Sequence, residues 1–335
     1  MMRPGGGFAR LTLCLLATAA LLSCSGPVVT AVGSSNDLVV ICDADATDLA
    51  ELVVASLEYP QSWLHDEPAF VTTLTTPGNA GNLKNIRHVL LVGSMDGGAT
   101  GELAGSVFRG LGNDADPDLY ITEDVWAKRQ VVGAVVGANA EDVAAFLRDQ
   151  GDRVRTEMES AALARLSSSL RETAVEAGMA AAMSERFGWS VSPPTGYDFY
   201  TTDAGGGFVF FRRTRPDRTV FVHWTSGSPE FVSEQYALSK REELAVHYLD
   251  GDAIEWNRPV EAERVDFLGL PAVRVSGWWG NRSLVGGGPF RSYCFFDPAS
   301  ERVYLLDVSL FAPGFEKTPL MKNLDAIAHT FTLDG

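Results

Sequence analysis

The chain is poor in the residues that build disulfide frameworks, metal centres and nucleic-acid-binding surfaces. Its 335 residues include four cysteines, five histidines and five lysines, and 43 acidic residues outnumber 27 basic ones to give a net charge of −16. An acidic excess of this size argues against binding to nucleic acid and against electrostatic attachment to anionic lipid, because both are themselves negative. The scarcity of lysine beside 22 arginines also fits a salty habitat or a GC-rich genome, so it does not require an acidic binding face.

Standard catalytic and cofactor motifs are missing as well. The sequence contains no Gly-x-Ser-x-Gly elbow, no His-Glu-x-x-His pair, no P-loop and no Cys-x-x-Cys pair. The letters "GLGNDA" at 110–115 match a dinucleotide-binding pattern, but "LAGSVFR" before them does not predict the strand that such a motif follows. We therefore expect no cofactor, and the missing signatures favour a protein that is not an enzyme.

Three aspartates at alternate positions need a separate explanation. Asp114, Asp116 and Asp118 are spaced as the ligands of a calcium loop are, because a hard cation needs several oxygens. Leu119 and Val125, however, occupy the positions where that loop needs glycine and glutamate. The spacing therefore predicts a solvated acidic loop and no metal site.

A second group of aspartates follows the first predicted strand. Asp43, Asp45 and Asp48 lie where open α/β sheets bind their ligands. No histidine or further carboxylate motif is fixed to them by spacing, so we interpret them as caps of the following helix.

The N-terminal segment has the composition of a targeting sequence. Arg3 and Arg10 supply positive charge, and residues 11–22 form an apolar run of the length of a signal-peptide core. No later run reaches the length of a membrane span, so we expect the rest of the chain to be soluble. Removing this segment makes the net charge −18, because it takes away two arginines and no acid.

The segment ends in a pattern that resembles the lipobox of bacterial lipoproteins. Leu21 lies three positions before Cys24 and the small Ser23 lies directly before it, although Leu22 is bulkier than usual at its position. In such proteins the cysteine is acylated, for example with palmitate, and becomes the mature N-terminus. The alternatives are an ordinary secretory signal or a transmembrane anchor. Ser25, instead of aspartate, favours the outer membrane over other locations in the cell envelope.

The other cysteines do not form a disulfide framework. Cys14 is removed with the signal peptide, which leaves Cys42 and Cys294 in two different predicted domains. Each lies in an apolar, strand-like run, where a free cysteine behaves as a small buried hydrophobe. A single bridge between the two is the alternative in an oxidising compartment.

Hydrophobic patterning divides the chain into five segments. We predict a lipoprotein signal peptide at 1–23, a tether at 24–35, an N-terminal α/β domain with a mixed sheet at 36–138, connecting helices at 139–187, and a C-terminal antiparallel α+β domain at 188–335. The fold class is α+β. Strands in the first domain are predicted from the runs "DLVVICD", "FVTTLT", "HVLLVGS" and "RQVVGAVVGA".

The helical elements have recognisable start and stop signals. The long pattern begins at Asn139, a good N-cap, and is expected to stop at Gly188. It predicts one or two helices, with Gly151 and Gly178 as the natural places for a break. In the second domain we predict a helix that begins at Ser228 and another at Thr318, with the strands "GYDFYTT", "GFVFFRR", "RTVFVHW", "RVDFLG", "AVRVSGWW", "FRSYCFF" and "RVYLLDVSLF" around them.

The stretch "GWWGNRSLVGGGPF" at 277–290 is the most unusual part of the second domain. Trp278 and Trp279 are neighbours on a predicted strand, so their side chains point to opposite faces of the sheet. The glycines before the proline allow positive φ and close backbone approach. Packing within the sheet and a binding surface both remain open, and the candidate surface consists of Trp278, Trp279, Gly286, Gly287, Pro289, Arg291 and Tyr293.

The histidines are spread along the chain at positions 65, 88, 223, 247 and 329. His88 and His223 lie within predicted strands, where a histidine is most often a satisfied sheet residue. A Ser-His-Asp assembly built by folding remains an alternative, because such triads are recognised by geometry and not by sequence order.

An ordered set of short motifs resembles a family of bacterial lipoproteins, the domain of unknown function 4837. The motifs are "GSSNDLVV", "DVWAKRQVV", "FGWSVSPPTGY", "GLPAVRVSGWW" with "GGPFRSY", and "FAPGFEKTPLMKNLDAI", which together extend over residues 33–331. Family members tend to carry a tryptophan after the first acidic pair, where this chain has Ala46 and Thr47. The resemblance implies a lipid-anchored envelope protein and supplies no active-site residues.

We therefore expect a lipid-anchored cell-envelope protein that serves as a binding or structural module. Its partners would be the membrane, through the lipid on Cys24, and an envelope protein or glycan. The alternative is an envelope hydrolase whose catalytic site is assembled only in the fold.

Overall fold

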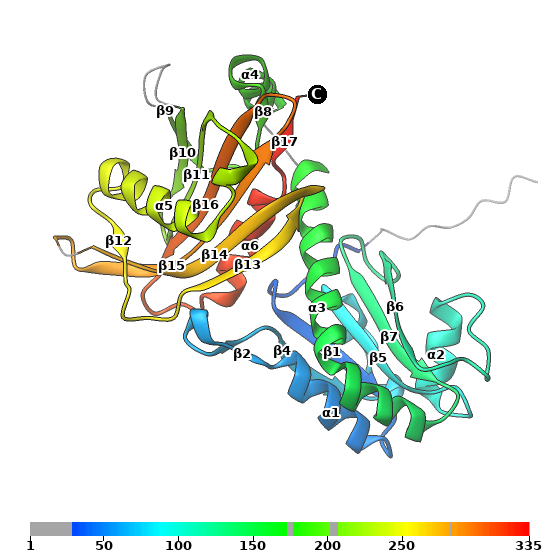
Figure 1. Cartoon of the computed structure of the whole chain (residues 1–335). Helices are drawn as coiled ribbons and strands as arrows, with labels where there is room; N and C mark the ends of the chain where they lie inside the picture. Colours follow the sequence, from blue (N-terminus) through cyan, green and yellow to red (C-terminus); the bar gives the residue numbers. More distant parts are fainter. Residues whose placement is uncertain (1–28, 173–176, 202–206, 282, 335) are drawn as a thin grey trace, which may run out of the picture.

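The computed structural model describes residues 29–172, 177–201, 207–281 and 283–334. Within them the chain is an α+β molecule with two separate main sheets, and the long helix α3 (Ala140–Glu172) runs from one to the other (Figure 1). No helix of the described segments is both long enough and apolar enough to cross a membrane. The predicted signal peptide, Cys14 and Cys24 lie outside the described residues.

The N-terminal sheet has five strands in the order β4-β1-β5-β7-β6. Four of them are parallel, and β6 pairs antiparallel with β7, so the predicted mixed sheet is confirmed. The bounds are β1 (Asp37–Cys42), β4 (Val71–Thr75), β5 (His88–Ser94), β6 (Asp118–Glu123) and β7 (Val131–Gly137). The patterning missed β6, an edge strand whose side chains are mostly half-exposed.

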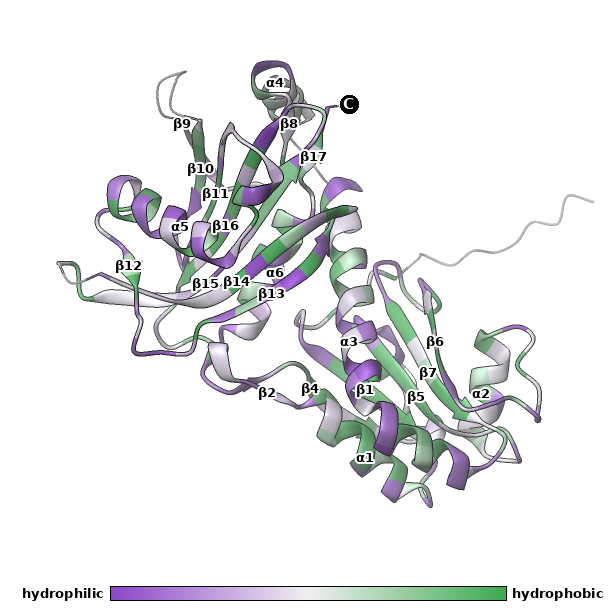
Figure 2. Cartoon of the chain, viewed as in Figure 1, coloured by the Kyte–Doolittle hydropathy of each residue, from purple (hydrophilic) through white to green (hydrophobic). Residues whose placement is uncertain are grey.

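Helices cover both faces of this sheet. Helices α1 (Thr47–Leu57) and α3 pack on one face and α2 (Ala99–Val107) packs on the other. The central strands β1, β5 and β7 are consequently apolar along almost their whole length, as Figure 2 shows, because a parallel strand covered on both sides has no solvent face.

Residues 29–32, in the predicted tether, are attached to the N-terminal sheet. The amide of Ala31 donates to the carbonyl of Lys128, and the amide of Val32 donates to the carbonyl of Asn85. Ala31 is buried. Contacts with the N-terminal sheet therefore begin before residue 36.

Helix α3 begins where the sequence predicts, because the Asn139 side chain accepts a hydrogen bond from the amide of Asp142 at 3.0 Å. The predicted break at Gly151 is wrong, since the helix continues through it. The glycine is needed for packing: a Cβ atom there would lie 2.2 Å from Oγ of Ser56 on α1. Gly178 lies within α4 (Ala177–Phe187), and Gly188 follows α4 with φ of +78°, which confirms it as the stop signal.

The C-terminal sheet has eight strands in the order β12-β14-β15-β16-β11-β10-β9, with β13 also paired to β14. Its neighbours are antiparallel throughout, as predicted. The bounds are β9 (Asp198–Thr201), β10 (Phe208–Arg213), β11 (Asp217–Ser226), β12 (Ala253–Ile254), β13 (Glu261–Phe267), β14 (Leu270–Asn281), β15 (Gly286–Asp297) and β16 (Arg302–Phe311).

Short elements complete the fold. Strand β8 (Trp189–Ser190) pairs with β17 (Thr332–Leu333), and β2 (Pro60–Gln61) pairs with β3 (Glu67–Pro68). The remaining turns are the 3₁₀ helices η1 (Ser62–Leu64), η2 (Pro77–Asn79), η3 (Gly81–Asn85) and η4 (Pro229–Phe231).

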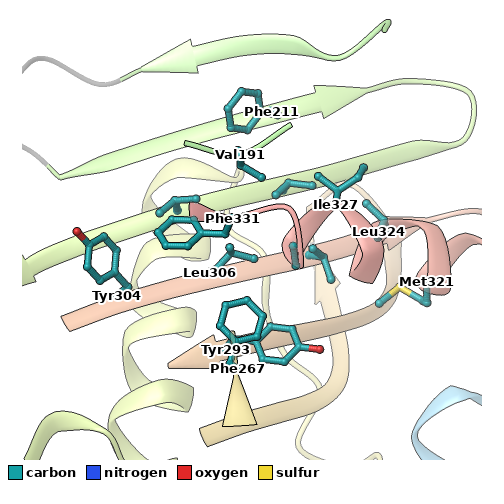
Figure 3. Packing of buried hydrophobic residues seen from close by; sticks show 14 of the residues in the cluster. Val191, Phe211, Phe267, Tyr293, Tyr304, Leu306, Met321, Leu324, Ile327 and Phe331 are labelled. Carbon is teal, nitrogen blue, oxygen red and sulfur yellow. The ribbon is translucent and has the colours of Figure 1, made fainter. Parts of the chain in front are cut away.

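Two helices pack on opposite faces of the C-terminal sheet. Helix α6 (Thr318–Ala328) begins at the predicted residue and contributes Met321, Leu324 and Ile327 to the cluster drawn in Figure 3, which also contains Leu306 and Phe331. Helix α5 (Glu234–Tyr248) covers the other face.

The predicted start of α5 at Ser228 is wrong. Residues 229–231 form the separate turn η4, and the helix begins later, where Oγ of Ser233 accepts a hydrogen bond from the amide of Tyr236 at 3.2 Å. Ser228 and Ser233 both have the sequence features of an N-cap, but only Ser233 is followed by an uninterrupted helix.

Candidate functional site

The two adjacent tryptophans lie on opposite faces of the C-terminal sheet, as strand geometry predicts. Trp278 faces the N-terminal half of the chain, where its Nε1 donates to the carbonyl of Trp63 at 2.7 Å. Its ring also contacts His65 and the guanidinium of Arg258. Trp279 belongs to the apolar cluster beneath α5. Both side chains are buried, at 8% and 9% exposure.

The candidate residues predicted as one binding surface therefore do not form one. In an antiparallel pair, residues opposite each other point to the same face, and Trp278 lies opposite Pro289. Arg291 and Tyr293, at alternate positions from Pro289, share the Trp278 face, as does Gly287. Gly286 lies on the other face with Trp279.

The triple glycine is part of strand β15 and not a flexible loop. None of Gly286, Gly287 and Gly288 has positive φ; the turn places it at Val285 instead. The glycines are required by close approach, since a Cβ atom on Gly288 would lie 1.8 Å from the carbonyl oxygen of Leu310. The stretch therefore serves tight packing between β14, β15 and β16.

A large polar cleft lies between the two sheets on the Trp278 side. We call it the junction cleft; its volume is about 680 Å³, and both halves of the chain line it. Its walls carry more cations than carboxylates, although the whole chain is strongly acidic. The cations are Arg87, Arg129, Arg155, Arg165, Arg274, Arg291 and Lys322, and the carboxylates are Glu159, Glu261, Glu263, Asp266 and Asp325.

The two halves are held together around this cleft by specific contacts. Trp63 and Leu64 of η1 insert into the main core of the C-terminal sheet. The carboxylate of Glu67 accepts hydrogen bonds from the amides of Lys317 and Thr318 at 2.6 and 2.7 Å, so it caps the N-terminus of α6 from the other half of the chain. These contacts fix the positions of the cleft walls relative to each other.

On the C-terminal wall, each carboxylate oxygen of Asp325 accepts a hydrogen bond from a side chain. Nη1 of Arg291 donates to it at 2.7 Å and the hydroxyl of Tyr293 donates at 2.6 Å. Burial opposes its charge, but Arg291, His329 and Tyr293 together lower the pKa of Asp325. Of the predicted surface residues, Arg291 and Tyr293 thus hold a buried carboxylate ionised, and Arg291 also lines the cleft.

Lys322 lies deep in the same wall, with 19% of its side chain exposed. Its Nζ donates to the carbonyl of Ala69 at 2.6 Å and lies 3.7 Å from the Phe70 ring centroid. Burial lowers the pKa of Lys322 to about 8, and Glu159 at 3.7 Å opposes the shift. The residue is therefore still mainly cationic at neutral pH.

Two arginines on the N-terminal wall have no carboxylate partner. Arg87 and Arg129 form no ion pair within the described residues, and Nε of Arg87 donates only to the carbonyl of Gly33, at 2.9 Å. Burial lowers the pKa of Arg87 and repulsion from Arg129 lowers it further, although the carboxylate of Asp37 opposes the shift. Two neighbouring guanidinium groups that form no ion pair favour the binding of an anion.

The position of Arg129 is fixed by a strained turn. Its backbone has φ of +65°, which is unusual for a residue other than glycine. The next residue, Gln130, is fully buried and its Nε2 donates to the carbonyl of Ile86 at 2.7 Å, while its amide donates to Asp124. Asp124 in turn binds Arg165 of α3 at 2.9 Å. The turn is thus held in place before any ligand arrives.

The described residues do not assemble a familiar catalytic centre. The imidazoles of His88, His223 and His329 each contact a backbone carbonyl at 2.8 to 2.9 Å, and that of His65 contacts Arg258. Burial lowers the pKa of His88 to about 3, so it stays neutral in the cleft wall. No group of three or more potential metal ligands occurs in the part of the chain that is described.

The other predicted residues have structural surroundings. Cys42 and Cys294 are both free and buried, and burial raises the pKa of each thiol, that of Cys294 to about 12. Such thiols are unreactive. Asp43 caps a helix, but it accepts from the amide of Thr100 in α2 and not from the following helix α1. Asp118, in the acidic stretch, pairs with Arg153 at 3.0 Å.

Sequence reasoning missed the residues that distinguish the cleft. Arg87, Arg129 and Lys322 belong to no catalytic or cofactor motif, and they come from distant segments that only the fold brings together. The one available signal was compositional: lysine is so rare in this chain that each lysine is worth locating.

The fold and the cleft define a two-part α+β protein with a ligand-sized cavity between its halves. Residues 176–330, the C-terminal half of the chain, match the model of a family described as a domain of unknown function (DUF4837). Residues 31–171 match a second model, a domain of unknown function (DUF8532). The predicted resemblance is thus confirmed for the C-terminal half, whereas the motifs "GSSNDLVV" and "DVWAKRQVV" lie in the second match.

Similarity to solved structures is distant, and no curated protein sequence matches the chain. A Bacteroides thetaiotaomicron structure is 10% identical with a TM-score of 0.27 and covers 44% of this chain, which spans only 45% of that one. The Saccharomyces cerevisiae Ran-binding protein Mog1p is 11% identical with a TM-score of 0.28, over 44% of this chain and 90% of its own. Mycobacterium tuberculosis LpqN, described as involved in cell envelope biogenesis, is 13% identical with a TM-score of 0.28, over 43% and 82%.

Proposed function

We propose that this protein is a lipid-anchored binding module of the cell envelope and a receptor for an acidic ligand that enters the junction cleft. The observation that carries the binding role is the pair Arg87 and Arg129, which line a cavity of about 680 Å³ and form no ion pair within the described residues. A ligand with phosphate or carboxylate groups would supply the missing counter-charge through charge-assisted hydrogen bonds.

The anchoring part of the proposal rests on the sequence of residues 1–24. The order of positive charge, apolar run and small residue before Cys24 is that of a lipoprotein signal, and Ser25 after the cysteine supports attachment at the outer membrane. In this arrangement the lipid holds the protein at the membrane and the cleft binds a component of the envelope.

The anchor is tested by Cys24→Ala in cells fed a radiolabelled or alkyne-tagged palmitate. The wild type should carry the label and sediment with membranes, whereas the variant should lose the label and its processing should stop or change. An unlabelled wild type, or a variant with the same mature size and membrane association, would contradict lipidation at this cysteine.

The binding role is tested by calorimetric titration of the full-length protein in detergent with pyrophosphate and with citrate at low salt. Replacing Arg129 by Gln should weaken binding of the better ligand by about tenfold, the value of one charge-assisted hydrogen bond. Arg148→Gln is the matched control, because Arg148 is exposed on α3 outside the cleft. Equal affinity of wild type and Arg129→Gln, or no binding of either anion, would contradict the role.

A further inference from the structure

We propose that a second cavity, on the opposite face of the C-terminal sheet, is a binding site for a saccharide. This cavity, which we call the Trp279 pocket, has a volume of about 350 Å³ and does not share a lining residue with the junction cleft. It lies where the end of α5 meets the hairpin between β14 and β15. The proposal is independent of the ligand proposed for the cleft.

The walls of the Trp279 pocket provide flat apolar surfaces. Phe210, Tyr248, Trp279 and Phe311 line it, and the rings of Trp279 and Phe311 are tilted toward each other with centroids 6.3 Å apart. Gly286 leaves room beside them, because a Cβ atom there would already lie 3.4 Å from the Phe311 ring. Aromatic faces of this kind accept the apolar C–H face of a sugar ring.

The same pocket contains two carboxylates that form no ion pair within the described residues. Nε and Nη2 of Arg212 both donate to Asp217, whereas Asp250 and Asp252 have no such partner. Asp252 accepts only the amide of the Asn281 side chain, at 2.8 Å. Burial is the main cause that raises the pKa of Asp252. Both carboxylates therefore keep oxygen acceptors that a ligand in the pocket can use.

Asn281 fixes the arrangement of these acceptors. Its Nδ2 also donates to the carbonyl of Asp250 at 2.9 Å, and its Oδ1 accepts from the amides of Ser283 and Leu284 at 3.0 and 2.8 Å. One buried amide therefore ties the α5 end of the pocket to the turn of the hairpin. The pocket is held in shape without a ligand.

A buried donor on the pocket wall is also unmatched. Trp279 is 9% exposed, and its Nε1 has no hydrogen-bond partner within the described residues. A buried indole N–H usually has an acceptor, so this donor is an unsatisfied polar atom of the wall. Protein atoms cover it, and the ring of Trp279 lines the pocket through its apolar part.

A saccharide matches the aromatic walls and the carboxylates together. An organic cation would pair with Asp250 and Asp252 but would lie beside the guanidinium of Arg212 on the same wall, and an anion would be repelled by the two carboxylates. A purely apolar ligand would bury the carboxylates without donors, which is costly. A saccharide has hydroxyls that both donate and accept, and a ring face that packs on aromatic side chains.

Calorimetric titration of the full-length protein in a detergent without a sugar headgroup tests the proposal. The probes are N-acetylglucosamine, its β-1,4-linked dimer, glucose and maltose, each up to about 20 mM. At least one should bind saturably, and Asp252→Asn should weaken it by about tenfold because a hydrogen bond to a charged acceptor is lost.

Trp279→Phe is the second variant, since it reduces the aromatic surface of the pocket wall and removes no hydrogen bond within the protein. It should weaken the same sugar severalfold, with folding checked by thermal unfolding. Asp114→Asn, an exposed aspartate in the N-terminal half, should bind as the wild type does. The proposal is overturned if none of the four sugars binds, if both pocket variants bind with wild-type affinity, or if choline chloride binds in their place with the same dependence on Asp252.

Discussion

Trp278 and Trp279 have nearly equal exposure but different surroundings, because alternation along a strand sends adjacent side chains to opposite faces. That alternation was predictable from the sequence. The partners were not: the indole of Trp278 binds the carbonyl of Trp63, which is 215 positions away. The same limit applies to Gly151, which the sequence marks as a helix breaker and the fold uses as a contact point with Ser56.

The contact at Gly151 predicts a coupling with Ser56. We expect Gly151→Ala to destabilise the protein by about 1 kcal/mol or more, because the clash with Oγ of Ser56 exceeds the gain in helix propensity. In a Ser56→Ala background the nearest atom is Cβ, at 3.2 Å, so the same change should cost less by about 1 kcal/mol. Urea unfolding of the four proteins measures this; additive effects would contradict the contact.

Burial of neutral His88 predicts a dependence of stability on pH. Its pKa is lowered to about 3 in the folded protein, so the unfolded chain binds the extra proton first and stability falls as pH decreases below about 6.5. Between pH 6.5 and 5 the loss from this residue should be about 2 kcal/mol. The His88→Gln variant should lose that part of the slope, and His247→Gln, at an exposed position, should keep it. Equal slopes in all three proteins would exclude His88 as the cause.

Helix α6 connects the two halves of the molecule more directly than its sequence suggests. The start at Thr318 and its apolar stripe were predictable from local signals, and the structure confirms both. Its cap was not, because the residue that fills this role is Glu67, in the short strand β3 of the other half. Lys317 occupies the N-cap position of α6, but its side chain forms no capping hydrogen bond. Local sequence signals therefore set where α6 begins, whereas a residue from the other half of the chain stabilises its N-terminus.

The capping contact predicts that Glu67→Ala lowers the free energy of unfolding by about 1 to 2 kcal/mol, since two helix amides lose a charged acceptor. Glu67→Gln should cost less, because one oxygen acceptor is retained. Glu51→Ala, at an exposed position on α1, is the control and should change stability little. Chemical unfolding measures all three, and a Glu67→Ala protein as stable as the control would show that the cap does not hold α6.

The whole molecule carries a net negative charge, whereas the junction cleft is lined by more cations than carboxylates. A net charge of −16 argues against anionic partners in general, yet the junction cleft gathers seven cationic side chains against five carboxylates. Composition alone could not reveal this. Arg87 lies just before β5 and Arg129 just before β7, while Lys322 lies on α6, and the three line one cleft only when both halves are folded. The fold class and the mixed and antiparallel sheets were within reach of patterning; the cleft was not.

Hydrogen–deuterium exchange of the full-length protein, with and without saturating pyrophosphate, tests directly whether an acidic ligand binds between the two halves. The account predicts slower exchange in the segments around Arg87 and Arg129, and at the start of α6, where the cleft walls meet. Saturating binding with protection confined to segments outside the cleft would contradict the central claim.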